Sequence, residues 1–232
     1  MNIKIASNEV IHFIGIGGIG MSGLALIMNN MGFKIQGSDL NANQNTERLK
    51  KLKLKIFIGH KYENIKNSTL VVISSAIKKK NPELKYAKRN KLPIYKRGDM
   101  LANIVSLKKN IVVTGSHGKT TTTSLISSVL HNSKLDATVI NGGIINQIKN
   151  SARLGKSEWS VLESDESDGS FLKIPVTYSV VTNIDKEHLD FYKSFDNLKK
   201  SFQDFVEKTP IFGKSFICLD NINNQNVLYQ YL

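Results

Sequence analysis

The sequence has a single cysteine and no long apolar run. One cysteine, Cys218, excludes an internal disulfide and any metal site built from cysteines. It lies in the apolar run 215–219, where we expect a buried strand residue. No apolar run approaches the ~20 residues that a membrane span needs, and residues 1–10 lack the basic start and long apolar stretch of a secretion signal. These absences favour a cytoplasmic protein.

Acidic residues are outnumbered, with 19 Asp and Glu against 32 Lys and Arg, for a net charge of +13. The lysines are scattered, and no aromatic-and-basic motif that reads bases accompanies them, so we expect no nucleic-acid partner. The sequence also shows no Ser-His-Asp or Cys-His arrangement, so we expect no protein nucleophile. At 232 residues, 41% hydrophobic and 22% charged, the chain is long enough for one large or two small soluble domains.

The strongest motif is an apolar strand, residues 111–114, that runs into a glycine loop and then a helix over 119–131. Backbone N–H groups converge where such a helix starts, and its dipole favours an anion such as phosphate. Lys119 can reach the outer phosphates, and Thr120 can offer its hydroxyl to magnesium. The predicted ATP-binding residues of this loop are Gly115, Ser116, His117, Gly118, Lys119, Thr120 and Thr121.

The loop departs from the usual P-loop, whose spacing requires glycine where this chain has Val113. The alternative is a plain glycine turn followed by a solvated lysine. Four consecutive threonines, residues 120–123, count against that alternative, because β-branched residues are poor helix formers unless their hydroxyls serve the helix start or a ligand.

A second glycine loop lies near the N-terminus, between a strand at Val10–Ile14 and an apolar helix at Met21–Asn30. Its G-x-G-x-x-G pattern indicates a diphosphate at a helix N-terminus, and Ser38 and Asp39 follow about twenty residues later, where a dinucleotide fold places its ribose-binding acid. These residues alone also allow an NAD-dependent oxidoreductase, or a tight turn without a ligand. The predicted binding residues are Gly15, Gly17, Gly18, Gly20, Ser38 and Asp39.

Polar residues follow three further apolar strands, at the edge where parallel strands face a ligand. Ser74 and Ser75 end a strand at 70–73, although such hydroxyls commonly only satisfy a turn. Four acids in 163–168 follow a strand at 159–162 and suit a hard divalent cation beside a triphosphate. A third strand, 178–182, is followed by residues 183–190, which include Asn183 and His188.

These motifs resemble those of the Mur ligases, the ATP-dependent amino-acid ligases of peptidoglycan synthesis. The ATP loop with histidine before its second glycine and four threonines after its lysine is most similar to the members that add L-alanine to UDP-N-acetylmuramate. The resemblance implies that Ser74 and Ser75 belong with the first glycine loop in a UDP-sugar site. The family usually has Arg-Ala-Glu-Met-Leu where this chain has residues 97–101, which leaves any role of Arg97 open.

The resemblance also implies the reaction. ATP with Mg²⁺ activates the lactyl carboxylate of UDP-N-acetylmuramate as an acyl phosphate, and L-alanine then forms the amide. The implied catalytic residues are Lys119, Glu163 and His188. The implied metal ligands are Thr120, Glu163 and His188, and the resemblance also implies that Asn183 contacts ATP. Among the remaining acids of 163–168, we regard Glu166 as a solvated loop residue or a helix cap.

The predicted fold is α/β: a Rossmann-like parallel-sheet domain at 1–107 that binds the UDP-sugar, then a P-loop-type α/β domain at 108–232 that binds ATP. We place the boundary at the polar break 108–110 and expect Asp99 to cap a helix over 100–107. Family members continue well beyond this length into a third domain. We therefore expect the 232-residue chain alone to be inactive, with an exposed apolar edge near 212–219. A nucleotide-binding module without catalysis is the alternative.

Overall fold

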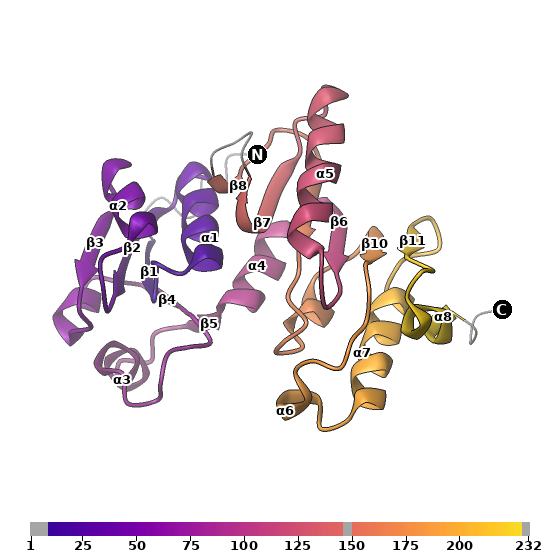
Figure 1. Cartoon of the computed structure of the whole chain (residues 1–232). Coiled ribbons are helices and arrows are strands. Elements are labelled where there is room, and N and C mark those ends of the chain that lie inside the picture. The colour runs from indigo at the N-terminus through magenta and orange to yellow at the C-terminus, as the bar shows by residue number, and fades with distance from the viewer. Residues whose placement is uncertain (1–8, 146–149, 229–232) are drawn as a thin grey trace. The chain divides into compact units, whose positions relative to one another are not determined.

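The computed structural model describes residues 9–145 and 150–228. They form two compact α/β units, one of residues 9–100 with 150–154 and the other of residues 101–145 with 155–228 (Figure 1). No helix in the described ranges is long and apolar enough to cross a membrane.

The first unit is built on a sheet with the strand order β3-β2-β1-β4-β5, and its neighbouring strands all pair in parallel. Because the order reverses at β1, the loops after β1 and β4 lie at a switch point, where open α/β sheets bind ligands. The strands are β1 (Val10–Ile14), β2 (Lys34–Asp39), β3 (Lys55–Ile58), β4 (Leu70–Ile73) and β5 (Ile94–Lys96). The helices are α1 (Ile19–Asn30), α2 (Gln44–Lys51), η2 (Tyr62–Ile65), α3 (Pro82–Arg89) and α4 (Arg97–Val105), the last of which runs on into the second unit.

Local sequence explains where the helices of this unit begin. Asn43 caps α2 and forms a capping box with Thr46. Asn81 caps α3, and Pro82 takes the first helical position. Helix α1 is buried over residues 21–28, so it belongs to the core of the unit. A second part of that core is formed by Ile14, Ile65, Val71, Leu84 and Ala87.

The second unit has a sheet with the strands β11-β10-β6-β9-β7 in that order, and these neighbours also pair in parallel. Its strands are β6 (Lys109–Thr114), β7 (Thr138–Ile145), β9 (Trp159–Glu163), β10 (Tyr178–Val181) and β11 (Lys214–Ile217). Its helices are α5 (Lys119–Asn132), η3 (Ser170–Lys173), α6 (Leu189–Tyr192), α7 (Phe195–Glu207) and α8 (Ile222–Leu228). Strand β8 (Asn150–Arg153) belongs to the first unit and packs there against α1, where a Cβ on Gly23 would lie 3.1 Å from the Cβ of Ala152.

Three phenylalanines form an aromatic cluster in the core of the second unit. Phe171 from η3 is fully buried, with its ring centroid 5.5 Å from that of Phe202 and 5.3 Å from that of Phe205. Both partners lie on α7, whose apolar residues recur at helical spacing. The cluster fixes α7 against the segment that carries the acids at 163–168.

Three sequence-based predictions about local structure were wrong. Cys218 is exposed, because β11 ends at Ile217 and is the edge strand of its sheet. Asp99 lies in the first turn of α4 and not at its N-cap, because the helix already begins at Arg97. Asn110 was expected in the polar break 108–110 but lies buried in β6. Its side-chain amide donates to the carbonyl oxygens of Val105 and Pro175, which allows this polar residue to be buried.

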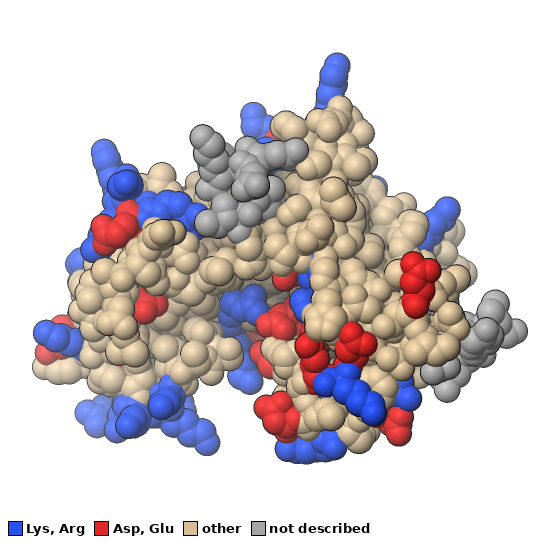
Figure 2. Space-filling model, viewed as in Figure 1, with Lys and Arg blue, Asp and Glu red and all other residues tan. Residues whose placement is uncertain are grey.

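The expected apolar edge is present at β11. Phe212 is 94% exposed and Phe216 is 53% exposed, and Ile211 and Leu219 beside them are exposed as well. Basic side chains are spread over several parts of the face shown in Figure 2, in keeping with their scatter along the sequence.

Candidate functional site

The ATP loop of the second unit joins β6 to α5, in the strand–loop–helix order that the sequence predicted. Gly115 has φ +135°, and a Cβ there would collide with the hydroxyl of Thr182 at 2.1 Å. Gly118 is the N-cap of α5 with φ +78°, a left-handed conformation that glycine adopts without strain. No side chain caps this helix, and its first turn holds no acid, so its first N–H groups are open to a ligand.

Lys119 points back over this loop. Its ammonium donates to the carbonyl oxygens of Gly115 and Ser116, and it contacts the carboxylate of Glu166 at 3.1 Å to Oε1 and 3.0 Å to Oε2. These three partners use all three donors of the ammonium. A phosphate that binds Lys119 must therefore replace at least one of them.

Glu166 is the residue whose position sequence reasoning missed. It is 1% exposed, and burial raises the pKa of its carboxyl group although the Lys119 charge opposes the shift. The nearby hydroxyl of Tyr192 donates to its backbone carbonyl oxygen. Glu166 is one of four acids in six residues, and nothing in that pattern tells which acid folds inward.

Thr120 and Glu163 form a second pair in this unit. The Thr120 hydroxyl donates to Glu163 Oε2 at 2.9 Å, and the N–H of Gly142 donates to the same oxygen at 2.6 Å. A Cβ on Gly142 would lie 2.3 Å from Glu163 Oε1, so only glycine allows this approach. A hydroxyl and a carboxylate supply oxygen ligands, which fit Mg²⁺.

His188, the third expected metal ligand, contacts a different acid. Its Nε2 lies 3.6 Å from Glu166 Oε1 and 3.9 Å from Glu187 Oε2. Asp165, Glu166 and His188 could together offer three ligand atoms to an ion. The Lys119 ammonium occupies Glu166, however, and a second cation there would be repelled. The donor set at Thr120 and Glu163 therefore fits a divalent ion better.

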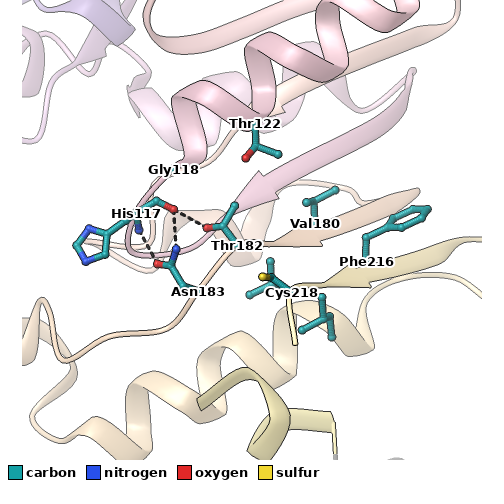
Figure 3. A pocket seen from close by; sticks show the side chains of 10 residues that line it. His117, Gly118, Thr122, Val180, Thr182, Asn183, Phe216 and Cys218 are labelled. Atoms are coloured by element: carbon teal, nitrogen blue, oxygen red, sulfur yellow. Dashed lines mark hydrogen bonds between the residues drawn. The ribbon is translucent and has the colours of Figure 1, made fainter. Parts of the chain in front are cut away.

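Asn183 supports the ATP loop from the end of β10. Its Oδ1 accepts from the N–H of His117 at 2.8 Å, and its Nδ2 donates to the carbonyl oxygen of the same residue at 3.0 Å (Figure 3). Thr182 donates to that carbonyl oxygen as well. Ser116 is buried, with its hydroxyl accepting from the N–H of Asp185. These contacts fix the loop conformation from the end of β10 and the residues that follow it.

The remaining loop side chains are open to solvent. His117 is exposed, with Nε2 3.1 Å from Asp185 Oδ2, and Thr121 lies exposed in the first turn of α5. A cavity of about 540 Å³ opens beside the loop, lined by His117, Gly118, Thr122, Val180, Val181, Thr182, Asn183, Phe216, Ile217 and Cys218. Figure 3 shows a polar side at His117 and Asn183 and an apolar side at β10 and β11.

The first glycine loop leads from β1 into α1 at the switch point of the first sheet. The N–H groups of Gly15 and Ile16 both donate to the carbonyl oxygen of Ser38, and the N–H of Gly17 donates to Asp39 Oδ2 at 2.8 Å. Gly18 is the N-cap of α1, without a capping side chain. The end of β2 thus fixes this loop, and the start of α1 stays open.

The predicted residues around this loop take different positions. Asp39 touches the loop directly, whereas Ser38 is fully buried and donates inward to Glu83 Oε2 at 2.5 Å. Ser74 lies against the loop, since a Cβ on Gly15 would be 3.2 Å from the Cβ of Ser74. Ser75 is exposed. Sequence reasoning did not single out Glu83, which looked like an ordinary acid in the first turn of a capped helix.

Two family descriptions match successive regions of the chain, and each region contains one of the two glycine loops. Residues 10–109 match the description "Mur ligase family, catalytic domain", and residues 113–230 match "Mur ligase middle domain". The chain belongs to the Mur ligase family. The first match ends at residue 109 and the second begins at residue 113, close to the domain boundary expected at 107/108. The structure instead divides the chain at 100/101, so the expected boundary stays a prediction.

Two curated relatives with high sequence identity to the chain carry the same name. The chain is 66% identical over 228 residues to UDP-N-acetylmuramate–L-alanine ligase of Pelagibacter ubique, and the match covers 98% of this chain and 49% of that protein. The ligase of the same name from Parvibaculum lavamentivorans is 53% identical, covering 91% of this chain and 43% of that one. The chain thus spans about half the length of the curated relatives it matches.

Solved structures of Mur ligases share the fold. The UDP-N-acetylmuramate–alanine ligase of Thermotoga maritima superposes with a TM-score of 0.88 at 30% identity, covering 94% of this chain and 50% of that one. A UDP-N-acetylmuramate:L-alanyl-γ-D-glutamyl-meso-diaminopimelate ligase of Neisseria gives a TM-score of 0.89 at 25% identity, covering 96% and 75%. The α/β fold predicted from the sequence is confirmed.

Proposed function

We propose that this chain is the nucleotide-binding part of a ligase that joins L-alanine to the lactyl carboxylate of UDP-N-acetylmuramate. The observation that carries the proposal is the presence of two helix-starting glycine loops in the two matched Mur ligase regions, together with relatives named for this reaction. One loop suits a diphosphate and the other a triphosphate with its metal.

The proposed reaction balances as two displacements. A carboxylate oxygen attacks the γ-phosphorus of ATP, ADP leaves, and an acyl phosphate forms. The amine of L-alanine then attacks the acyl carbon, phosphate leaves, and the nitrogen gives up a proton. Neither step needs a protein nucleophile.

The residues of the second unit would act mainly by position and charge. The open N–H groups at the start of α5 and the Lys119 ammonium would neutralise charge on the transferred phosphoryl group. Mg²⁺ would be held by Thr120 and Glu163, with His188 as a further predicted ligand, and would supply charge neutralisation between the phosphates. Asn183 would keep the loop in its binding conformation.

Binding and turnover test different parts of the proposal. We expect the 232-residue chain to bind UDP-N-acetylmuramate and Mg-ATP in calorimetric titrations, and not NAD. We expect UDP-N-acetylmuramoyl-L-alanine, detected by mass spectrometry, from a chimera of this chain with the remaining half of the Pelagibacter ubique relative. An acyl phosphate hydrolyses in water, so the site must close before the amine attacks, and we expect no product from the short chain.

The alternative is a nucleotide-binding module without catalysis. It predicts that the chimera binds both nucleotides and makes no product, whereas the relative's own full-length enzyme does under the same conditions. Tight NAD binding without a response to UDP would instead favour an oxidoreductase and would refute the proposal.

A further inference from the structure

Arg97, the first residue of α4, lies against the start of α1 in the first unit. A Cβ built on Gly20 would be 3.1 Å from Arg97 Nη1, 3.3 Å from its Cδ and 3.5 Å from its Cζ. The guanidinium plane and its stem thus fill the space that a side chain at position 20 would need. This contact gives a reason for the fourth glycine of the loop.

The guanidinium is half-buried, and among residues 9–145 and 150–228 it has no hydrogen-bond or ion-pair partner. A guanidinium carries five N–H donors in a planar fork that matches phosphate. Its neighbour is the positive end of α1, where a cation is electrostatically unfavourable in the absence of an anion.

The backbone beside Arg97 also has donors to spare. The first helical bond of α1 runs from the N–H of Ser22 to the carbonyl oxygen of Gly18, so the N–H groups of residues 19–21 precede it. The N-cap, Gly18, offers no side chain to them, and the first turn contains no acid. By contrast, the N–H groups of residues 15–17 are already bonded to the end of β2.

We propose that Arg97 binds the diphosphate of the nucleotide-sugar, sharing it with the free N–H groups at the start of α1. This assignment rests on the proposed function, which puts a UDP-sugar at this loop, and it gives Arg97 the role that its sequence context left open. The bound diphosphate would neutralise two neighbouring positive charges, the Arg97 guanidinium and the N-terminal end of α1.

The test is UDP binding by the 232-residue chain, with UDP itself as the probe. Arg97→Gln removes the charge and keeps much of the stem that packs on Gly20, whereas Arg97→Lys keeps a charge without the planar fork. The matched control is Arg89→Gln, which changes the net charge equally at an exposed position in the last turn of α3. Affinity is measured by calorimetry, and the unfolding temperature is measured without ligand.

We expect Arg97→Gln to weaken UDP binding about 10- to 100-fold, the scale of a charge-assisted hydrogen bond. Arg97→Lys should fall between it and the wild type, and Arg89→Gln should bind like the wild type. The unliganded unfolding temperature of Arg97→Gln should stay the same or rise, because a repulsion is removed. If Arg97 had a merely structural role, the Arg97→Gln substitution would lower the unliganded unfolding temperature.

Two results would overturn the assignment while leaving the proposed function standing. One is wild-type UDP affinity in Arg97→Gln, and the other is an equal loss in Arg89→Gln, which would show a general effect of net charge. A wild-type chain that does not bind UDP at all would remove both the proposed function of the first unit and the role of Arg97.

Discussion

Glu83 is a fully buried carboxylate at the centre of a polar network in the first unit. It accepts hydrogen bonds from Ser38 at 2.5 Å and from the side chain of Asn64 at 2.6 Å. The ring nitrogens of His12 and His60 lie 3.4 and 3.3 Å from Oε2. These partners come from β1, β2, η2 and the segment after β3, so Glu83 on α3 ties one side of the sheet together.

We expect Glu83→Ala to destabilise the first unit by about 3–5 kcal/mol, the usual cost of removing one member of a buried charged pair. Two donors, the Ser38 hydroxyl and the Asn64 amide, would lose their closest acceptor, and Ser38 is itself fully buried. Glu83→Gln should cost less, because its side-chain oxygen can still accept one of these bonds. The matched control is Glu47→Ala in the same unit, whose partly exposed pair with Lys50 should contribute less than about 1 kcal/mol.

The single tryptophan makes the assay specific to one unit. Trp159 lies in β9, so its fluorescence reports unfolding of the second unit, whereas far-UV circular dichroism reports both. In urea titrations we expect Glu83→Ala to move part of the dichroism transition to lower urea and to leave the Trp159 transition in place. A Glu83→Ala curve that coincides with that of Glu47→Ala would refute the argument that the network stabilises this unit.

Three further outcomes follow from the same contacts. Lys119→Ala should weaken ATP binding by about 1.5–3 kcal/mol and leave UDP binding unchanged in calorimetry. The control Lys200→Ala, at an exposed position on α7, should change neither affinity, and an equal loss of UDP affinity in Lys119→Ala would show that the two sites are misplaced. Burial alone would raise the pKa of Glu83, but hydrogen bonds from His12 and Ser38, the His12 charge and the Asn64 hydrogen bond hold this pKa below its ordinary 4.5. The stabilisation by ionised Glu83 is therefore present above pH 4.5 and is lost as the pH falls through the lowered pKa. Acid titration of wild type against Glu83→Gln checks this, and identical acid transitions would contradict it. Phe212→Ser should reduce self-association in sedimentation velocity, because Phe212 is 94% exposed beside the edge strand; unchanged association would place the contact elsewhere.

The motifs were predictable from sequence because their order along the chain is physically restrictive. A strand, a glycine loop and a helix in succession allow few geometries, and both loops have the structure that this order predicts. The proximity of Thr120 and Glu163 could also be predicted from the sequence, because each follows or ends one of two adjacent parallel strands, whose ends lie at the same edge of the sheet.

Long-range burial was not predictable in the same way. Glu83 and Glu166 occupy patterns that are normally solvated, a helix first turn and an acid-rich loop, and only the packing of distant strands makes them buried. The prediction that Cys218 is buried was wrong in the opposite sense, because Cys218 is exposed. An apolar run predicts a strand but does not tell whether a neighbouring strand covers it. The family resemblance pointed to Arg97 but left its role open, since the glycine against which it lies is 77 positions earlier, at the start of another helix.

The caps of the helices show how binding constrains this fold. Helices α2, α3 and α7 begin with Asn43, Asn81 and Ser194, whose side chains accept from the first turn, and such a cap is worth about 1 kcal/mol. Helices α1 and α5 begin at Gly18 and Gly118 without that contribution. A capping side chain there would occupy the N–H groups that the phosphates of the proposed substrates require. The protein without ligand therefore lacks stabilisation at two places, and each bound nucleotide would supply it to its own unit through its phosphates.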